Sequence, residues 1–259
     1  MNYPLTDCLC EKQLVSTVNA FSNAKPESVI YQTSLMSALL SGVYDGNTTV
    51  ASLLTKGDFG LGTFNQLDGE LIAFDSRVYQ LRADGSASTA RPDQKTPFAV
   101  MTFFKPEYRH CFSQPASRQD VHQVIDRQLQ SDNKFCALRI DGLFSADTRT
   151  VPCQHRPYRS MPEILGDQPV FNFNRRHGVV IGFRTPQYMQ GINVAGYHEH
   201  FITDDRRGGG HLLDYSLQEG VLTFGVISKL VIDLPQDSDF LQANLTPENL
   251  DSAIRSVES

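Results

Sequence analysis

Residues 196–211 read GYHEHFITDDRRGGGH, in which two strand-like segments flank a polar, glycine-rich turn. Residues two apart in an extended strand point to the same face, so His198 and His200 present their imidazoles side by side. The glycines at residues 208–210 permit a tight reversal with positive φ angles, and His211 then begins the next strand. The stretch therefore predicts two adjacent strands that bring three imidazoles to one face.

This group of histidines has the composition of a metal site. Three nitrogen ligands with an open position are typical of catalytic zinc, although cobalt, nickel, manganese or iron can occupy the same ligands. An H-x-H pair alone is more often a solvated surface pair, and His211 behind the turn favours the metal site. Glu199 alternates to the opposite face, which makes it a weak candidate for the chemistry. His122 belongs to no such group and is expected to be solvated.

Composition limits the class of protein. The chain has 259 residues, 40% of them hydrophobic and 20% charged, as in ordinary soluble globular proteins. Its net charge of −6, with no basic cluster, argues against nucleic acid or an anionic membrane as partner. No apolar run approaches the ~20 residues of a spanning helix.

The N-terminus and the cysteines indicate the compartment. The first residues, MNYPLTDCLCEKQ, lack the basic and apolar segments of a secretion signal. Five cysteines are scattered along the chain, which favours free thiols in a reducing environment over a disulfide framework. We therefore expect a cytoplasmic protein.

Periodic apolar residues predict four helices, which cover residues 31–43, residues 48–55, residues 117–130 and a C-terminal segment that starts at Thr246. Thr48 is the expected cap of the second helix. Ser117 and Asp120 stand at the spacing of a capping box, and Pro247 suits the first position of the last helix.

Apolar runs between these helices predict strands at residues 71–74, 78–81, 98–104, 135–140, 179–183, 192–202 and 222–234. The last run alternates along a single face. Residues 149–174 are rich in proline and arginine and are the best candidate for a crossing between two halves. We therefore predict an N-terminal mixed-sheet domain at residues 1–160 and a β-rich metal-binding domain with a C-terminal helix at residues 161–259.

Three charged residues could serve a metal-bound substrate. Glu70 follows an Asp-Gly turn at the start of a strand, where an exposed edge glutamate is nevertheless the commoner outcome. Arg149 could hold a carboxylate, but the surrounding segment contains several other arginines, so composition does not select it. Glu258 is the penultimate residue, and chain ends are usually frayed.

Four segments of this sequence resemble the bacterial acetolactate decarboxylase family. They are YQTSLMSALLSGVYDG, GDFGLGTFNQLDGELIAFD, FRTPQYMQGINVAGYHEHFITDDRRGGGHLLD and the tail that ends in VES. The resemblance runs from about Tyr31 to the end of the chain. Its most specific part is GYHEHF with the following glycines and histidine, combined with GTFNQLDGE.

The resemblance implies an α/β (α+β) fold of two domains with mixed β-sheets, flanking helices and a zinc ion near the domain junction. It also implies a homodimer. The family's zinc ligands fall on His198, His200 and His211. Its catalytic residues fall on Thr63, Glu70, Arg149 and Glu258.

The implied reaction is the decarboxylation of (S)-2-acetolactate to (R)-acetoin and carbon dioxide. Loss of carbon dioxide leaves electrons that move into the neighbouring ketone as an enediolate, which zinc stabilises as a Lewis acid. Arg149 would hold the leaving carboxylate, and Glu70 or Glu258 would protonate the enediolate. The mechanism needs no organic cofactor.

Two alternatives remain open from the residues. The same three histidines could serve another metal-dependent lyase or hydrolase. The chain could also be a non-enzymatic, DNA-associated module of related fold, since related folds host unrelated functions. The acidic balance counts against DNA binding.

Overall fold

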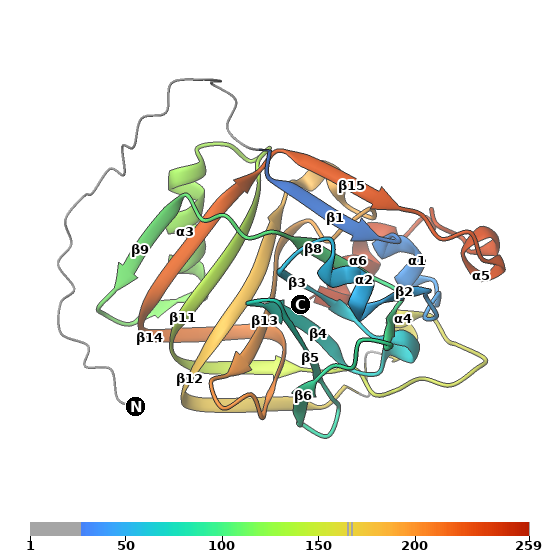
Figure 1. Ribbon diagram of the computed structural model, residues 1–259, viewed down its shortest axis with the longest axis horizontal. Coiled ribbons are helices and arrows are strands. Elements are labelled where there is room, and N and C mark those ends of the chain that lie inside the picture. Colours follow the sequence, from blue (N-terminus) through green and yellow to red (C-terminus); the bar gives the residue numbers. More distant parts are fainter. Residues whose placement is uncertain (1–26, 165, 167, 259) are drawn as a thin grey trace.

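The computed structural model describes residues 27–258 except 165 and 167, and it consists mostly of β-strands with a few short helices (Figure 1). The predicted combination of α-helices and β-sheets is confirmed. The N-terminal segment, including Cys8 and Cys10, lies outside the described residues. The expectation of a cytoplasmic protein rests partly on that segment. Cys111, Cys136 and Cys153 are free thiols, as the sequence predicts.

The first sheet has seven strands in the order β15-β1-β8-β3-β4-β5-β6. Their bounds are β1 (Val29–Thr33), β3 (Phe59–Thr63), β4 (Glu70–Phe74), β5 (Arg77–Leu81), β6 (Ala87–Thr89), β8 (Ala99–Thr102) and β15 (Lys229–Asp233). β1 and β15 pair in parallel and the other neighbours are antiparallel, so this sheet is mixed.

The second sheet has six strands, all paired antiparallel. Their bounds are β9 (Tyr108–Phe112), β10 (Ala116–Ser117), β11 (Phe135–Arg149), β12 (Val170–Thr185), β13 (Gly196–Thr203) and β14 (Gly209–Ile227). β12 pairs with β11 and β13, and β14 pairs with the same two strands. These four long strands therefore close into a ring (Figure 1). A short two-stranded ladder joins β2 (Thr48–Thr49) to β7 (Lys95–Thr96).

Two apolar cores lie on the two faces of the second sheet. Helix α3 (Arg118–Leu129) buries Val121, Ile125 and Leu129 against one face. The first sheet covers the other face, where Ile72 packs in the same core as Ile202. The contacts run between β3 and β4 of the first sheet and β12 and β13 of the second. Side chains of β13 therefore face the first sheet and α3 alternately.

The remaining helices are short: α1 (Met36–Leu40), α2 (Val50–Leu54), α4 (Met161–Ile164), α5 (Ser238–Gln242) and α6 (Leu250–Glu258). α1, α4 and α6 pack against one another. The predicted capping box of α3 is confirmed. The Ser117 hydroxyl accepts a hydrogen bond from the Asp120 amide, and the Asp120 carboxylate accepts one from the Ser117 amide.

Three helix predictions are wrong at their starts. Residues 31–43 do not form one helix, because β1 occupies the segment up to Thr33 and only α1 is helical. Two partner strands, β8 and β15, stabilise the extended form of this β-branched and aromatic run. Thr49, rather than Thr48, caps α2 through the Ser52 amide. The last helix begins at Leu250 instead of Thr246.

The alternation of residues 222–234 predicts one strand, and this prediction is wrong. β14 ends at Ile227, and β15 belongs to the other sheet. The amides of Ser228 and Lys229 both donate to the Ser28 carbonyl, which draws the chain onto β1. The proline-rich segment connects β11 to its neighbour β12 in the same sheet. The division into domains at residue 160 stays a prediction.

Candidate active site

The turn between β13 and β14 differs from the one that the glycines predict. In this turn Arg206 adopts a positive φ of 57°. The glycines at residues 208–210, which are all described, have no positive φ. The Thr203 hydroxyl donates to Asp205 and holds the turn. The glycines serve close packing instead, since a Cβ on Gly209 would lie 2.1 Å from the Phe201 carbonyl oxygen. Gly209 lets β14 approach β13, and Gly210 lets it approach β11, since a Cβ on Gly210 would lie 2.5 Å from the Arg149 carbonyl oxygen.

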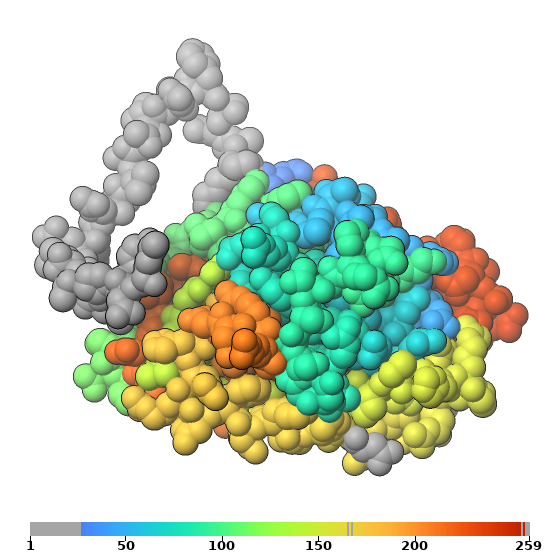
Figure 2. All heavy atoms as spheres, turned by 60° about the horizontal axis from the view of Figure 1, so that its bottom comes forward, coloured from blue at the N-terminus to red at the C-terminus, as the bar shows by residue number. Residues whose placement is uncertain are grey.

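The tip of this hairpin is anchored on the first sheet. The guanidinium of Arg206 lies over the ring of Phe74, 4.7 Å from its centroid. The Ala87 amide donates to the carbonyl of Arg207. Figure 2 shows the orange surface of the β13–β14 hairpin against the teal surface of the first sheet. This contact sets the position of β13 relative to β4.

The three histidines meet where β13 and β14 pair. His200 and His211 are direct partners across the two strands, and His198 stands two residues along β13 on the same face. Each histidine offers a ring nitrogen, and these nitrogens lie within 4.8 Å of one another. The exposed fractions of His198, His200 and His211 are 7%, 1% and 5%. The arrangement is compact enough for one ion to be held by all three.

A hydrogen bond to the first sheet selects the tautomer of His200. Its Nδ1 lies 2.9 Å from the carbonyl oxygen of Leu71, which can only accept a hydrogen bond. The proton therefore sits on Nδ1, and Nε2 carries a lone pair. Nε2 is buried and makes no hydrogen bond within the described part of the chain. A histidine whose second nitrogen donates to a carbonyl is typical of metal ligands.

Burial keeps the three imidazoles neutral. It lowers the pKa of His198 to about 3, and the positive charge of Arg149 adds to this effect. The pKa values of His200 and His211 are also lowered well below their usual range, chiefly by burial. A metal ligand must be neutral imidazole, so the site is in the required protonation state at neutral pH.

A hollow of about 460 Å³, partly open to solvent, lies beside the histidines. Its polar lining consists of Thr63, Glu70, Arg149, Gln168, His198 and His211. Thr63 and Glu70 are direct partners across β3 and β4, and the Thr63 hydroxyl donates to the Gly69 carbonyl. An oxygen of the Glu70 carboxyl lies 3.8 Å from Nε2 of His200. The fold thus brings together six of the seven predicted site residues.

Arg149 enters the hollow from the end of β11. It is the direct partner of His211 across β11 and β14, and 7% of its surface is exposed. Its Nη1 donates to Oε1 of Gln168 at 2.7 Å. Gln168 is not predictable from the sequence, because nothing in a proline-rich segment distinguishes a residue that returns to contact the strand before it.

Glu258 belongs to the last helix, and its side chain lies outside the described residues. The helix itself is docked: Ala253 and Ile254 are buried in the core between the sheets. It packs on α1 and α4, whose residues Met36 and Met161 line the hollow. The C-terminal helix is therefore held next to the candidate site.

The opposite face of β13 carries a buried charge. Glu199 has no exposed surface, as its alternation with the histidines implies, and it faces α3. Its Oε2 accepts from Nε of Arg118 at 2.7 Å and lies 3.1 Å from Nε2 of His122. The prediction that His122 is merely solvated is wrong, because its ring also stacks on Tyr197 at 3.6 Å between centroids.

Comparison with known proteins identifies the family of this chain. The family model described as alpha-acetolactate decarboxylase matches residues 30–247. The chain belongs to the alpha-acetolactate decarboxylase family. An alpha-acetolactate decarboxylase of Klebsiella aerogenes is 72% identical over 97% of both chains. One of Raoultella terrigena is 70% identical over 100% of this chain and 99% of its own length.

The fold agrees with that of solved members of the alpha-acetolactate decarboxylase family. The crystal structure of alpha-acetolactate decarboxylase from Bacillus subtilis strain 168 matches with a TM-score of 0.88 and 44% identity, over 90% of this chain and 100% of that one. Membership makes this chain an acetolactate decarboxylase by function, a carbon–carbon lyase, and favours that interpretation over a DNA-associated module. No helix in the described part is both long and apolar enough to span a membrane.

Proposed function

We propose that this chain converts (S)-2-acetolactate to (R)-acetoin and carbon dioxide with a divalent metal held by His198, His200 and His211. The observation that carries the proposal is the cluster of three buried, neutral ring nitrogens within 4.8 Å, beside a hollow lined by Arg149 and Glu70. The nitrogen donor set fits zinc, and other divalent transition ions fit the same ligands. When bound, the ion would supply Lewis acidity that stabilises the negative charge developing on the substrate's ketone oxygen.

Arg149 binds the substrate carboxylate in this proposal. A guanidinium can donate two parallel hydrogen bonds to a carboxylate, and burial of Arg149 strengthens them. Gln168 holds one end of the guanidinium and so limits its rotation. Because Arg149 and His211 are cross-strand partners, the carboxylate and the metal-binding end of the substrate are oriented by adjacent residues of one sheet. This orientation aligns the bond that breaks with the ketone that receives its electrons.

A glutamic acid then delivers a proton to the carbon that has lost carbon dioxide. Glu70 is one candidate, since its carboxyl stands 3.8 Å from His200 at the wall of the hollow. Thr63 supports it by donating to the carbonyl of Gly69, the residue before Glu70. Glu258 is the second candidate, brought near by the docked C-terminal helix. Delivery from one side of a planar intermediate gives a single enantiomer.

The rest of the hollow is apolar and limits the access of water. Its apolar lining comes from α1, from the segments before β4 and β8, and from the proline-rich segment: Met36, Leu39, Leu67, Phe98, Val151 and Met161. Low local polarity strengthens the interaction of Arg149 with a carboxylate. It also favours loss of the charged carboxylate as neutral carbon dioxide.

We also propose a cytoplasmic homodimer with a role in acetoin biosynthesis, without a nucleic-acid or membrane partner. The homodimer comes from the family resemblance, and the exclusion of nucleic acid rests on the net charge of −6. Light scattering on the purified protein measures the mass directly. A mass equal to one chain would reject the dimer.

The deciding experiment combines metal analysis with a decarboxylation assay. The wild-type protein is expected to contain one divalent ion per chain and to release carbon dioxide and (R)-acetoin from racemic acetolactate, as measured by chiral chromatography. His198→Ala should lose both the metal and the activity. His110→Ala, an exposed histidine outside the cluster, is the matched control and should retain both. Full activity of metal-free His198→Ala would reject the proposal.

A further inference from the structure

Arg118 occupies a position that no chemistry described so far requires. It is the first residue of α3, directly after the capping residue Ser117. The capping box fixes the start of the helix and so the direction in which Arg118 leaves it. The side chain is 21% exposed and reaches from the helix to the second sheet.

The guanidinium of Arg118 contacts both strands that carry the histidines. Its Nε donates to Glu199 on β13 at 2.7 Å, and its Nη2 lies 3.5 Å from the Tyr197 carbonyl on the same strand. Its Nη1 donates to the carbonyl of Leu213 on β14 at 2.9 Å. One rigid, planar group therefore bridges β13 and β14.

These contacts lie where the backbone ladder between the two strands ends. The pairing of β13 with β14 covers three residue pairs, from Ile202 with Gly209 to His200 with His211. His198 lies beyond the last pair, so no backbone hydrogen bond of this ladder fixes its distance from His211. Arg118 spans the gap at the level of residues 197–199 and 213.

We infer that Arg118 is a positioning residue for the metal centre: by bridging β13 and β14 it sets the separation of His198 from His211. The inference rests on the metal site proposed above. Arg118 touches neither histidine directly and acts through the strands. Residues that orient metal ligands in this way typically change metal affinity when they are replaced.

Glu199 fixes the position of the Arg118 guanidinium between β13 and β14. A carboxylate with no exposed surface is stable only when it is paired, which requires Arg118 and His122 to stay in place. Gly182, its partner on β12, provides the space, since a Cβ there would lie 2.7 Å from Cγ of Glu199. The chain between the two β13 histidines is thus fixed from its opposite face.

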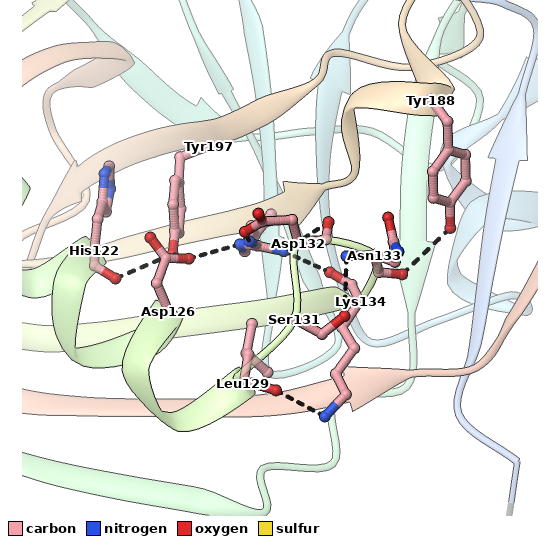
Figure 3. A network of polar contacts seen from close by, with 10 residues as sticks. His122, Asp126, Leu129, Ser131, Asp132, Asn133, Lys134, Tyr188 and Tyr197 are labelled. Carbon is pink, nitrogen blue, oxygen red and sulfur yellow. Dashed lines mark hydrogen bonds and ion pairs between the residues drawn. The ribbon is translucent and has the colours of Figure 1, made fainter.

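The helix that carries Arg118 is itself anchored to β13. The hydroxyl of Tyr197 donates to the carboxylate of Asp126 at 2.9 Å and lies 3.2 Å from the carbonyl oxygen of His122 (Figure 3). Asp126 also pairs with Arg184 on β12. Figure 3 shows Tyr197 and His122 with their rings parallel between β13 and α3. These contacts hold α3, the helix that carries Arg118, in a fixed position along β13.

The test compares Arg118→Met and Arg118→Lys with Arg139→Met. Arg139 is the matched control because its side chain is also 21% exposed and also pairs with carboxylates, those of Asp75 and Asp141, away from the histidines. Zinc affinity is measured by competition with a chromophoric chelator, and the ligand geometry by the visible absorption spectrum of the cobalt-loaded proteins. Circular dichroism checks that each variant is folded.

We expect Arg118→Met to weaken zinc binding by about 10- to 100-fold and to alter the cobalt spectrum. Arg118→Lys keeps the charge but carries its donors on a single nitrogen instead of a planar fork, so it should fall between Arg118→Met and wild type. Arg139→Met should match wild type in both readouts. If Arg118→Met fails to fold, Arg118→Lys against Arg139→Met carries the same comparison.

Two results would overturn the inference alone: a wild-type affinity and spectrum in the Arg118 variants, or an equal loss in Arg139→Met, which would indicate general destabilisation. In both cases the wild-type protein still binds cobalt and decarboxylates acetolactate. Failure of the wild-type protein to bind cobalt through His198 would instead overturn the metal site, and this inference with it.

Discussion

His200 and His211 stand directly opposite each other in the last residue pair of the β13–β14 ladder. That short ladder closes the ring formed by β11, β12, β13 and β14, so the two histidines lie at the seam of the closure. A ligand pair at such a seam links metal binding to the integrity of the ring, because any separation of the strands also separates the two imidazoles.

Removal of the metal should destabilise the protein as well as inactivate it. A ligand that binds only the folded chain raises its stability by about 2.7 kcal/mol at a free concentration 100 times its dissociation constant. We expect a chelator to lower the melting temperature of the wild-type protein and added zinc to restore it. His211→Ala should melt at one temperature with or without chelator. A chelator effect of equal size in that variant would contradict a site that contains His211.

Replacement of Arg149 should reduce substrate use more than it reduces folding. Hydrogen bonds to charged groups contribute about 1.5–3 kcal/mol each, so Arg149→Lys should lower kcat/KM by roughly 10- to 100-fold. Gln168→Ala should have a smaller effect in the same direction, since it only frees one end of the guanidinium. Steady-state kinetics with acetolactate provide the measurement. Unchanged kcat/KM in Arg149→Lys would exclude a bidentate role.

The two glutamates can be separated by isosteric replacement. Loss of a general acid typically costs about 10²- to 10⁴-fold in rate. If Glu70 is the proton donor, Glu70→Gln should lose activity to this extent while keeping its zinc, and Glu258→Gln should lose less. The enantiomeric purity of the acetoin is the second readout, because protonation by water from either side gives a mixture. A larger loss in Glu258→Gln would assign the proton to the C-terminal helix.

A methyl group at Gly209 should disturb the pairing of β13 with β14. The added Cβ would lie 2.1 Å from the Phe201 carbonyl oxygen, so β13 and β14 must move apart. Overpacking of this kind destabilises by about 1–3 kcal/mol, and we expect Gly209→Ala to lose zinc affinity together with stability. Gly166→Ala is the control, since a Cβ there meets nothing within 4 Å. Urea unfolding and chelator competition measure the two effects. Equal behaviour of both variants would show that strand spacing does not limit the site.

Local sequence patterns predicted the elements whose information lies within a few residues. The H-x-H alternation placed His198 and His200 on one face, and the spacing of Ser117 and Asp120 predicted the start of α3. The strands at residues 71–74 and 78–81 were also predictable, because two apolar runs flank Asp75 and Ser76, which adopt the positive φ angles of a tight turn. In each case the deciding feature is local: a side-chain period, a helix cap or a turn conformation.

Patterns failed where a distant partner decided the outcome. Residues 31–33 fit a helical period, yet they became strand because β8 and β15 offered them two rows of backbone hydrogen bonds. Residues 222–234 alternated without interruption, yet the chain changed sheets at Ser228. The glycines at residues 208–210 were correctly placed near the turn but for the wrong reason, since they relieve crowding between strands instead of supplying unusual φ angles.

By itself, then, the sequence determined which residues are capable of the chemistry: the histidines, the acid after the Asp-Gly turn and the family to which they belong. Only the tertiary structure decided which of them meet. It brought Arg149 opposite His211, placed Glu70 against His200 and paired Glu199 with Arg118. The physical reason is that residue type and spacing act over one or two turns of chain, whereas register and burial depend on strands that are distant in sequence.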